Sequence, residues 1–254
     1  GRAQVVDQNR EMKELADSLR SRHVDRPTAV RSLPTLIRRS ELPASRPGSP
    51  IIGMADDTLQ EWPAVAQGTV LVGGGAASGK SNALAVYAAS LREAVPGIRL
   101  THMTPTSSSI AGLRVWDRSA IGLAEVTSLA EAEKPVDTGT RPALPRQAFF
   151  VEGAAEIAAA GFGDLLTSLA RACVASGDLF VAESTSEQWS KAYELLNFLK
   201  SNGTALLLEP GEDDGYPLVN AQLPRFKKSE MVTGRGFWIH RGRAVKLQVP
   251  VHGQ

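Results

Sequence analysis

A glycine-rich segment at residues 73–81, with the sequence GGGAASGKS, carries the clearest chemistry in the chain. From Gly74 to Ser81 it matches the pattern G-x-x-x-x-G-K-[ST], which binds phosphate when a strand precedes it and a helix follows it. Glycines let backbone N–H groups approach a phosphate closely, and the N-terminus of the following helix adds the positive end of its dipole. A plain glycine-rich turn is the alternative, but the complete pattern favours nucleotide binding.

Two side chains of this loop have separate predicted roles. The ammonium group of Lys80 can reach the β- and γ-phosphates of a nucleotide, and the hydroxyl of Ser81 can complete a magnesium shell. We therefore predict that ATP and Mg²⁺ bind here. The predicted nucleotide-binding residues of the segment are Gly74, Gly75, Ala76, Ala77, Ser78, Gly79, Lys80, Ser81 and Asn82.

A second apolar segment, at residues 148–151, ends in Glu152 and Gly153. P-loop ATPases of the common motor type carry two acidic residues at such a strand end: the first helps to hold magnesium, and the second polarises the attacking water. Glu152 takes the first position, so Ser81 and Glu152 are the predicted metal ligands. A strand-end acid without this role is the alternative for Glu152. Gly153 stands where the catalytic carboxylate belongs.

Hydrolysis is therefore expected to be poor. The only catalytic candidates in this segment are Glu152 and Glu156, and Glu156 would be badly placed one helical turn beyond Gly153. Without a positioned base the chemical step loses roughly 10²–10⁴-fold in rate, whereas binding should survive because the phosphate loop does not depend on that residue. The Glu-Ser-Thr run at residues 183–185 can also lie near the γ-phosphate; an ordinary helix N-cap by its serine or threonine is an equal alternative.

The elements that must position these groups alternate along the chain. Short apolar runs predict strands, and apolar residues at helical spacing predict helices. We expect strands at residues 69–72, 98–103, 148–151, 179–182 and 205–208, and helices at 81–93, 122–132, 164–176 and 187–200. This alternation implies an α/β fold with a mostly parallel sheet and helices on both faces. The tail segments 237–240 and 245–249 are expected to form a C-terminal β-hairpin around Arg241-Gly242-Arg243.

The first fifty residues follow a different pattern. Residues 4–22 have the apolar spacing of a helix. Five prolines between residues 27 and 50 exclude a long helix there and indicate an extended connector, with a short edge strand at 35–37. We therefore divide the chain into an N-terminal helix with a Pro-rich connector, residues 1–49, and a P-loop ATPase domain, residues 50–254.

Composition narrows the class of protein without naming a partner. The chain has 254 residues, 43% of them hydrophobic, which suffices for one sizeable α/β core. Its net charge of +1 demands neither nucleic acid nor a membrane, and its single cysteine, Cys173, excludes an intramolecular disulfide. No histidine has metal-ligand spacing. No apolar run approaches the ~20 residues of a membrane span, so we expect no membrane insertion and a cytoplasmic location for this segment, whether or not its parent protein is membrane-anchored.

With these residues in view, the chain resembles the ATPase domains of FtsK/SpoIIIE type, and in particular a C-terminal module of EccC-like type VII secretion ATPases. The likeness extends over about residues 30–250. The segments that carry it are VRSLP at 30–34, PIIGMADD at 50–57, the loop at 74–81, LFVAE at 179–183, LLLEP at 206–210, LPR at 223–225, GRGFW at 234–238 and VKLQV at 245–249. The phosphate loop alone is generic, whereas the Gly-Arg-Gly-aromatic segment followed by a hydrophobic-Gln-Val strand is much more specific.

This resemblance implies a RecA-like P-loop fold, ATP and Mg²⁺ as ligands, and neighbouring ATPase domains in tandem or in a ring. In EccC-like proteins several such domains lie in a row behind membrane helices. The later ones are often degenerate at the catalytic acid, and the last resembles a receptor for secreted partner proteins. Arg235, in the Gly-Arg-Gly segment, becomes a further candidate for nucleotide contact, with a structural salt bridge as an equal alternative.

Two functions stay open on this basis. The first is an ATP-Mg-binding module with weak or no intrinsic hydrolysis that serves regulation or substrate docking in a protein secretion motor, with a small helical secreted protein as partner. The second is the motor domain of an FtsK/SpoIIIE-like DNA translocase. The lost acid at Gly153 opposes the second, and so does the stretch 147–223, which holds eleven acidic and three basic residues and would repel phosphates. DNA is therefore the less expected partner.

Overall fold

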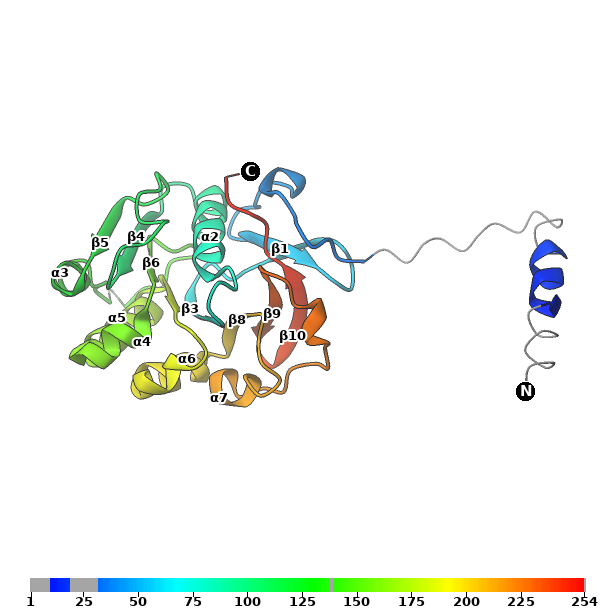
Figure 1. The fold of residues 1–254 in the computed structure, drawn as a ribbon. Helices are drawn as coiled ribbons and strands as arrows, with labels where there is room; N and C mark the ends of the chain where they lie inside the picture. The colour runs from blue at the N-terminus through cyan, green and yellow to red at the C-terminus, as the bar shows by residue number, and fades with distance from the viewer. Residues whose placement is uncertain (1–9, 19–31, 138, 254) are drawn as a thin grey trace. The chain divides into compact units, whose positions relative to one another are not determined.

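The structure, a computed structural model, describes residues 10–18, 32–137 and 139–253. The chain divides into two compact units, residues 1–32 and 33–254 (Figure 1). In the first unit, residues 10–18 are helical, and the rest of the helix predicted at 4–22 lies outside the described residues. The second unit begins at Leu33, so it includes part of the predicted connector, and the expected boundary between residues 49 and 50 falls within this compact unit.

One mixed sheet forms the centre of the second unit (Figure 1). The strands described there are β1 (Ile51–Ala55), β2 (Glu61–Pro63), β3 (Gly68–Gly74), β4 (Arg99–Thr104), β5 (Arg118–Ile121), β6 (Gln147–Val151), β7 (Leu179–Glu183), β8 (Thr204–Leu208), β9 (Arg235–His240) and β10 (Arg243–Gln248). Their order in the sheet is β2-β1-β10-β9-β8-β3-β7-β6-β4-β5. The strands from β8 to β5 run parallel, and those from β2 to β9 pair antiparallel. The predicted α/β fold with a mostly parallel sheet is confirmed.

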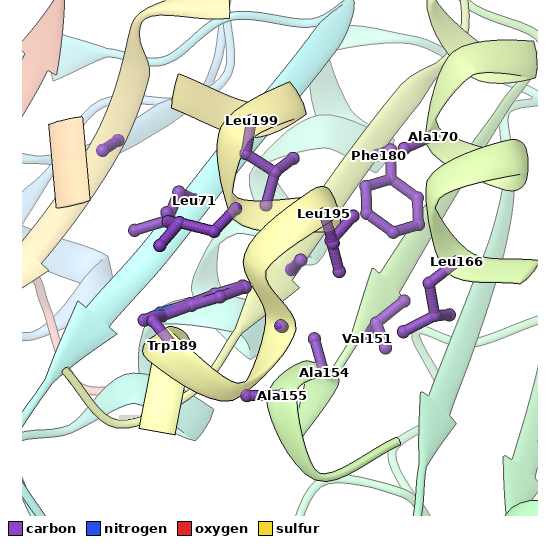
Figure 2. Close-up of a cluster of buried hydrophobic side chains, with 14 of the residues drawn as sticks. Leu71, Val151, Ala154, Ala155, Leu166, Ala170, Phe180, Trp189, Leu195 and Leu199 are labelled. Carbon is purple, nitrogen blue, oxygen red and sulfur yellow. The ribbon is translucent and has the colours of Figure 1, made fainter. Parts of the chain in front are cut away.

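Helices cover both faces of the sheet, as the alternation of elements predicted. They are α2 (Lys80–Ala94), α3 (Leu123–Ala132), α4 (Ala154–Ile157), α5 (Gly163–Ser176), α6 (Tyr193–Asn202) and α7 (Gly215–Val219). One buried cluster joins α2 to the sheet through Leu84, Tyr87 and Leu91. The cluster on the other face joins α3, α4, α5 and α6 to the sheet, and Figure 2 shows part of it around Phe180 and Trp189.

Consecutive side chains of the inner strands serve opposite faces. In β3, Leu71 belongs to the cluster of α5 and α6, while Val70 and Val72 belong to the cluster of α2. In β6, Phe149 and Phe150 divide in the same way. Because these strands are buried on both faces, they appear in the sequence as continuous apolar runs, and this made them predictable.

The strand predictions near the edges of the sheet differ from the structure. Strands β1, β2 and β5 were not predicted. The outermost two, β2 and β5, are short, contain a charged residue and bury few side chains, and Gly53 interrupts the apolar run of β1. The edge strand expected at residues 35–37 is wrong. There the chain makes only an isolated bridge, from Arg38 to Val251, and buries Ile37 against neighbouring apolar side chains.

The expectation that no apolar run has the length of a membrane span is also wrong. By length and composition the 23-residue helical segment Ala154–Ser176, with a mean hydropathy of 1.3, is apolar enough to cross a membrane. It begins with α4, continues through a π-helical stretch (Ala158–Phe162) and ends with α5, and a positive φ of 98° at Gly161 interrupts its helical dihedrals. Its buried side chains, such as Leu166 and Leu169, pack in the core against the sheet. A core helix meets the same criteria of length and composition as a membrane span, because both are long and rich in apolar residues.

The predicted C-terminal hairpin is confirmed. His240 of β9 lies opposite Arg243 of β10, so Arg241 and Gly242 form a two-residue turn. Both turn residues have positive φ, 50° and 79°, as in the type I′ turns that match the twist of a hairpin. At its other end the hairpin begins beside the glycine-rich loop, because the N–H of Gly234 donates to the carbonyl of Ser78 at 3.0 Å.

Candidate nucleotide-binding site

The glycine-rich loop connects the end of β3 to the start of α2, the setting that phosphate binding requires. Gly79 precedes the helix with a φ of 94°, a conformation that favours glycine. A Cβ at Gly74 would collide with the carbonyl oxygen of Leu208 on β8, which restricts this position to glycine as well. Ala76 and Ala77 are exposed, and within the described residues their backbone N–H groups donate to no protein acceptor. These donors are free to bind an anion.

Lys80 turns its side chain back towards this loop. Its Nζ donates to the carbonyl oxygen of Gly75 at 2.7 Å and lies 3.5 Å from Oε1 of Glu183, and both charged side chains are buried. A phosphate group is a stronger acceptor for an ammonium than a neutral carbonyl is. Binding of a nucleotide would therefore exchange the contact with Gly75 for contacts with phosphate oxygens.

Glu152, at the carboxyl end of β6, has three side-chain partners. Its Oε2 lies 2.9 Å from Nε2 of His102. The hydroxyls of Ser108 and Ser81 lie close enough to stabilise its charged form. Burial alone would raise the pKa of this carboxyl, but the hydrogen bonds outweigh burial and the net effect lowers its pKa. Glu152 is therefore ionised at neutral pH, and its oxygen lies beside the hydroxyl of Ser81, as the prediction of a shared magnesium site requires.

His102 is a site residue that the sequence analysis did not find. It is 0% exposed, stacks on Trp116 with ring centroids 5.0 Å apart, and has Nδ1 3.0 Å from Oγ of Ser119. The pairing of β4 with β6 places His102 opposite Phe150, two residues before Glu152 and on the same face. A histidine inside a predicted strand was the available signal, but its partner lies fifty residues away and becomes visible only in the sheet.

Glu183 lies at the end of β7, between the loop strand and the strand of Glu152. Its Oε2 accepts a hydrogen bond from the N–H of Gly153 at 3.1 Å, while its Oε1 faces Lys80. Burial raises the pKa of this carboxyl and the nearby charge of Glu152 adds to the shift, which Gly153 and Lys80 only partly offset. Of the two alternatives for residues 183–185, the helix N-cap by the serine or threonine does not occur, since the helical stretch that begins at Gln188 has Glu187 at its N-cap and no side-chain cap.

The position after Glu152 is closed to an added side chain. Gly153 has a φ of 61°, and a Cβ there would lie 2.8 Å from Cγ of Pro105. Both features disfavour any residue but glycine. The backbone conformation and the neighbouring Pro105 thus both disfavour a carboxylate side chain at position 153. A single substitution there would not insert one without displacing Pro105.

A polar cavity of about 350 Å³ opens next to these groups. Ser81, Glu152, Glu156 and Glu183 line one part of it, and the hydroxyl-rich segment 104–109, which follows β4, lines the rest. The cavity therefore adjoins the end of the loop at which Lys80 and Ser81 lie. Hydroxyl and carboxylate groups around such a space can orient water.

Two predicted nucleotide contacts have structural partners instead. The guanidinium of Arg235 is buried and donates to the carbonyl oxygens of Leu33 and Pro34 at 3.0 and 2.7 Å, as well as to Glu230 and Gln248. Asn82 donates to the carbonyl of Pro250 at 2.9 Å and accepts from the N–H of His252 at 2.8 Å. Arg235 thus joins the connector to the hairpin, and Asn82 fixes the C-terminal segment to α2. Neither side chain is available to a nucleotide in this arrangement.

The hydroxyl of Ser81 and the carboxylate of Glu152 are chemically suited to bind magnesium. Mg²⁺ prefers oxygen ligands and keeps several waters, and it uses one or two protein ligands together with substrate phosphates. Ser81 and Glu152 supply a hydroxyl and a carboxylate that line the same cavity. Among the residues that the structure describes, no group of three or more His, Cys, Asp and Glu side chains forms a metal site by itself. An ion here would depend on the nucleotide for its remaining ligands.

A parallel sheet with a glycine-rich loop at the carboxyl end of an inner strand defines a P-loop ATPase fold. No protein-family model matches the chain, and no curated protein matches it in sequence. Solved structures do match its fold. A structure of Thermomonospora curvata EccC, ATPases 2 and 3 in complex with a signal sequence peptide, is 18% identical with a TM-score of 0.70 and covers 91% of this chain.

Two further structures are similar. The cytoplasmic domain of the Thermomonospora curvata type VII secretion ATPase EccC is 17% identical with a TM-score of 0.69 over 91% of this chain. EssC from Geobacillus thermodenitrificans, ATPases 2 and 3, is 18% identical with a TM-score of 0.60 over 97% of this chain. This chain spans 46%, 30% and 50% of the three matched chains. At such identities the likeness establishes the fold.

Proposed function

We propose that this chain is an ATP-Mg-binding module of a protein secretion motor, with weak intrinsic hydrolysis and a role in regulation or substrate docking. The observation that carries the proposal is the loop at residues 74–81, which has free N–H donors, a lysine that faces it and a serine in contact with Glu152. The similarity in fold to ATPases 2 and 3 of EccC and EssC supports the secretion context.

Each group has a defined task in binding. The loop N–H groups and the ammonium of Lys80 would hold the phosphates, and Ser81 with Glu152 would hold Mg²⁺. When bound, the ion supplies positive charge that neutralises the phosphate oxygens. His102 holds the carboxylate of Glu152 in one orientation through its hydrogen bond, as groups that contact metal ligands commonly do. The missing carboxylate at Gly153 is the reason for weak hydrolysis.

Thermal unfolding with and without ATP and Mg²⁺ tests this proposal. A ligand that binds only the folded state stabilises it by about 2.7 kcal/mol at a concentration of 100 Kd. We expect ATP with Mg²⁺ to raise the melting temperature of the wild type and of Lys191→Ala, an exposed lysine outside the loop. Lys80→Ala should lose most of this shift. No shift in the wild type at any concentration of ATP would contradict the proposal.

The partners of the module follow from the same proposal. We expect a neighbouring ATPase domain in tandem or in a ring, and a small helical secreted protein as the docked substrate, by analogy with the EccC structure that holds a signal sequence peptide. The segment would then lie in the cytoplasm as part of a membrane-anchored parent; the similar EccC structure is the cytoplasmic domain of a type VII secretion ATPase. Titration with a candidate secreted protein and with duplex DNA at low salt separates this function from a DNA translocase, because tight, salt-sensitive binding to DNA alone would favour the translocase.

A further inference from the structure

We propose that Glu156 supplies the carboxylate that aligns the attacking water, in place of the acidic residue that Gly153 lacks. The inference deepens the proposed function and rests on it, because it requires ATP and Mg²⁺ at the glycine-rich loop. It assigns a catalytic residue that does not occupy the usual place directly after Glu152.

The position of the Glu156 carboxylate is the first observation that supports this assignment. Its Oε2 lies 3.2 Å from the point that a Cβ of residue 153 would occupy. The backbone explains this return, because the N–H of Glu156 donates to the carbonyl of Gly153 at 2.9 Å within the first turn of α4. The carboxylate of Glu156 therefore lies beside the point from which a side chain at position 153 would project.

The local packing fixes this arrangement. Ala154, Ala155 and Ile157 of α4 are fully buried, whereas Glu156 is exposed and lines the polar cavity together with Ser81. Three buried side chains in a helix of four residues hold its backbone against the core, as Figure 2 shows for the two alanines. The π-helical stretch that follows separates this turn from α5, and such irregularities are frequent at functional sites.

The other two carboxylates of the cavity are already occupied. Glu152 pairs with His102 through Oε2, and the nearby hydroxyls of Ser81 and Ser108 stabilise its charge. Glu183 faces Lys80 with one oxygen and the N–H of Gly153 with the other. In the part of the chain that the structure describes, the Glu156 carboxylate has no hydrogen-bond or ion-pair partner. It is the carboxylate of the cavity that is free to accept a hydrogen bond from water.

The chemical step balances with this assignment. The water oxygen forms a bond to the γ-phosphorus as the bond from that phosphorus to the β–γ bridging oxygen breaks, and the electron pair of the broken bond leaves with ADP. Glu156 accepts the proton of the water and later releases it to solvent or to the phosphate product. Because Glu156 acts from one helical turn away, its alignment of the water is less constrained than that of a strand-end acid, and we expect turnover to be slow.

The test compares Glu156→Gln with the wild type in two measurements. We expect kcat for ATP hydrolysis to fall about 10²-fold, the lower limit for loss of a positioned base, while the Kd for ATP with Mg²⁺, measured by calorimetry, stays within about twofold. Glu156→Asp should retain part of the activity. Glu131→Gln, at an exposed glutamate of α3, is the matched control and should change neither quantity.

Several outcomes would overturn the inference. If the wild type binds ATP but hydrolyses it no faster than Lys80→Ala, or if Glu156→Gln retains the kcat of the wild type, Glu156 is not the catalytic carboxylate, although the proposed binding function stands. If Gly153→Glu raises kcat above the wild type, position 153 accepts a carboxylate, and the space is not reserved for Glu156. If the wild type does not bind ATP, the proposed function fails and the inference fails with it.

Discussion

The glycine-rich loop at residues 74–81 and the strand end at residues 152–153 differ in how completely they keep the features of a P-loop ATPase. The loop has its full sequence pattern, its strand and helix, and its lysine in place. The strand end keeps one acid, Glu152, and replaces the next with Gly153, whose surroundings are closed by Pro105. Phosphate binding depends on one contiguous segment, so a change at the strand end need not remove it. Catalysis depends on several segments, so a change at one of them can remove it.

The buried tryptophan between these two regions gives the largest expected effect. Trp189 is 0% exposed, its Nε1 donates to the carbonyl of Val72 in the loop strand, and it belongs to the same buried cluster as Ala155 of α4 (Figure 2). Trp189→Ala should lower the free energy of unfolding by about 3–5 kcal/mol. Trp189→Phe keeps an apolar ring and should lose less. Denaturant unfolding measures both, and a loss below about 1 kcal/mol in the alanine variant would show that the two regions do not share this support.

A substitution at His102 tests the strand end by itself. His102→Ala removes a partner of Glu152, so we expect the affinity for ATP in the presence of Mg²⁺ to fall about tenfold, within the range for loss of a group that orients a metal ligand. The affinity measured in EDTA should change little, because the loop is untouched. Ser119→Ala, which removes only the second contact of His102, is the milder control. An equal loss with and without Mg²⁺ would mean that His102 supports the fold and not the metal site.

Substitution of Asn82 gives the smallest expected effect. It tests whether the nucleotide-binding segment extends beyond Ser81. Because its amide contacts Pro250 and His252, Asn82→Ala should lower the free energy of unfolding by about 1 kcal/mol per lost hydrogen bond and leave the affinity for ATP unchanged. Calorimetric titration and thermal unfolding of the same sample separate the two quantities. A weaker affinity for ATP with unchanged stability would restore the sequence-based prediction that Asn82 contacts the nucleotide.

The parts of the fold and site that the sequence predicted are those that local pattern determines. The buried strands β3, β6, β7 and β8 appear as apolar runs, and the loop is contiguous, so both were predicted with the correct order of elements. Strands β1, β2 and β5 were missed, because β2 and β5 are short and carry a charged residue and because Gly53 interrupts the apolar run of β1.

The remaining site residues depend on contacts between distant segments. Glu152 meets His102 only through the pairing of β4 with β6, and Glu183 meets Lys80 only because β7 lies next to β3. No spacing in the chain encodes these contacts. Arg235 shows the reverse case, since a recognisable motif suggested a ligand contact and the fold uses the residue to join the connector to the hairpin.

Measuring the affinity of the protein for ATP is the most direct test of the proposal that residues 74–81 bind a nucleotide. Calorimetric titration of the wild type, Lys80→Ala and Lys191→Ala with ATP in the presence of Mg²⁺ isolates the one ammonium that faces the phosphate loop among the described residues. We predict that Lys80→Ala binds at least about 10²-fold more weakly than the wild type, because charge-assisted contacts to phosphate are lost, and that Lys191→Ala binds as the wild type does. Equal affinity for ATP in the wild type and Lys80→Ala would contradict the assignment of residues 74–81 as a nucleotide-binding loop.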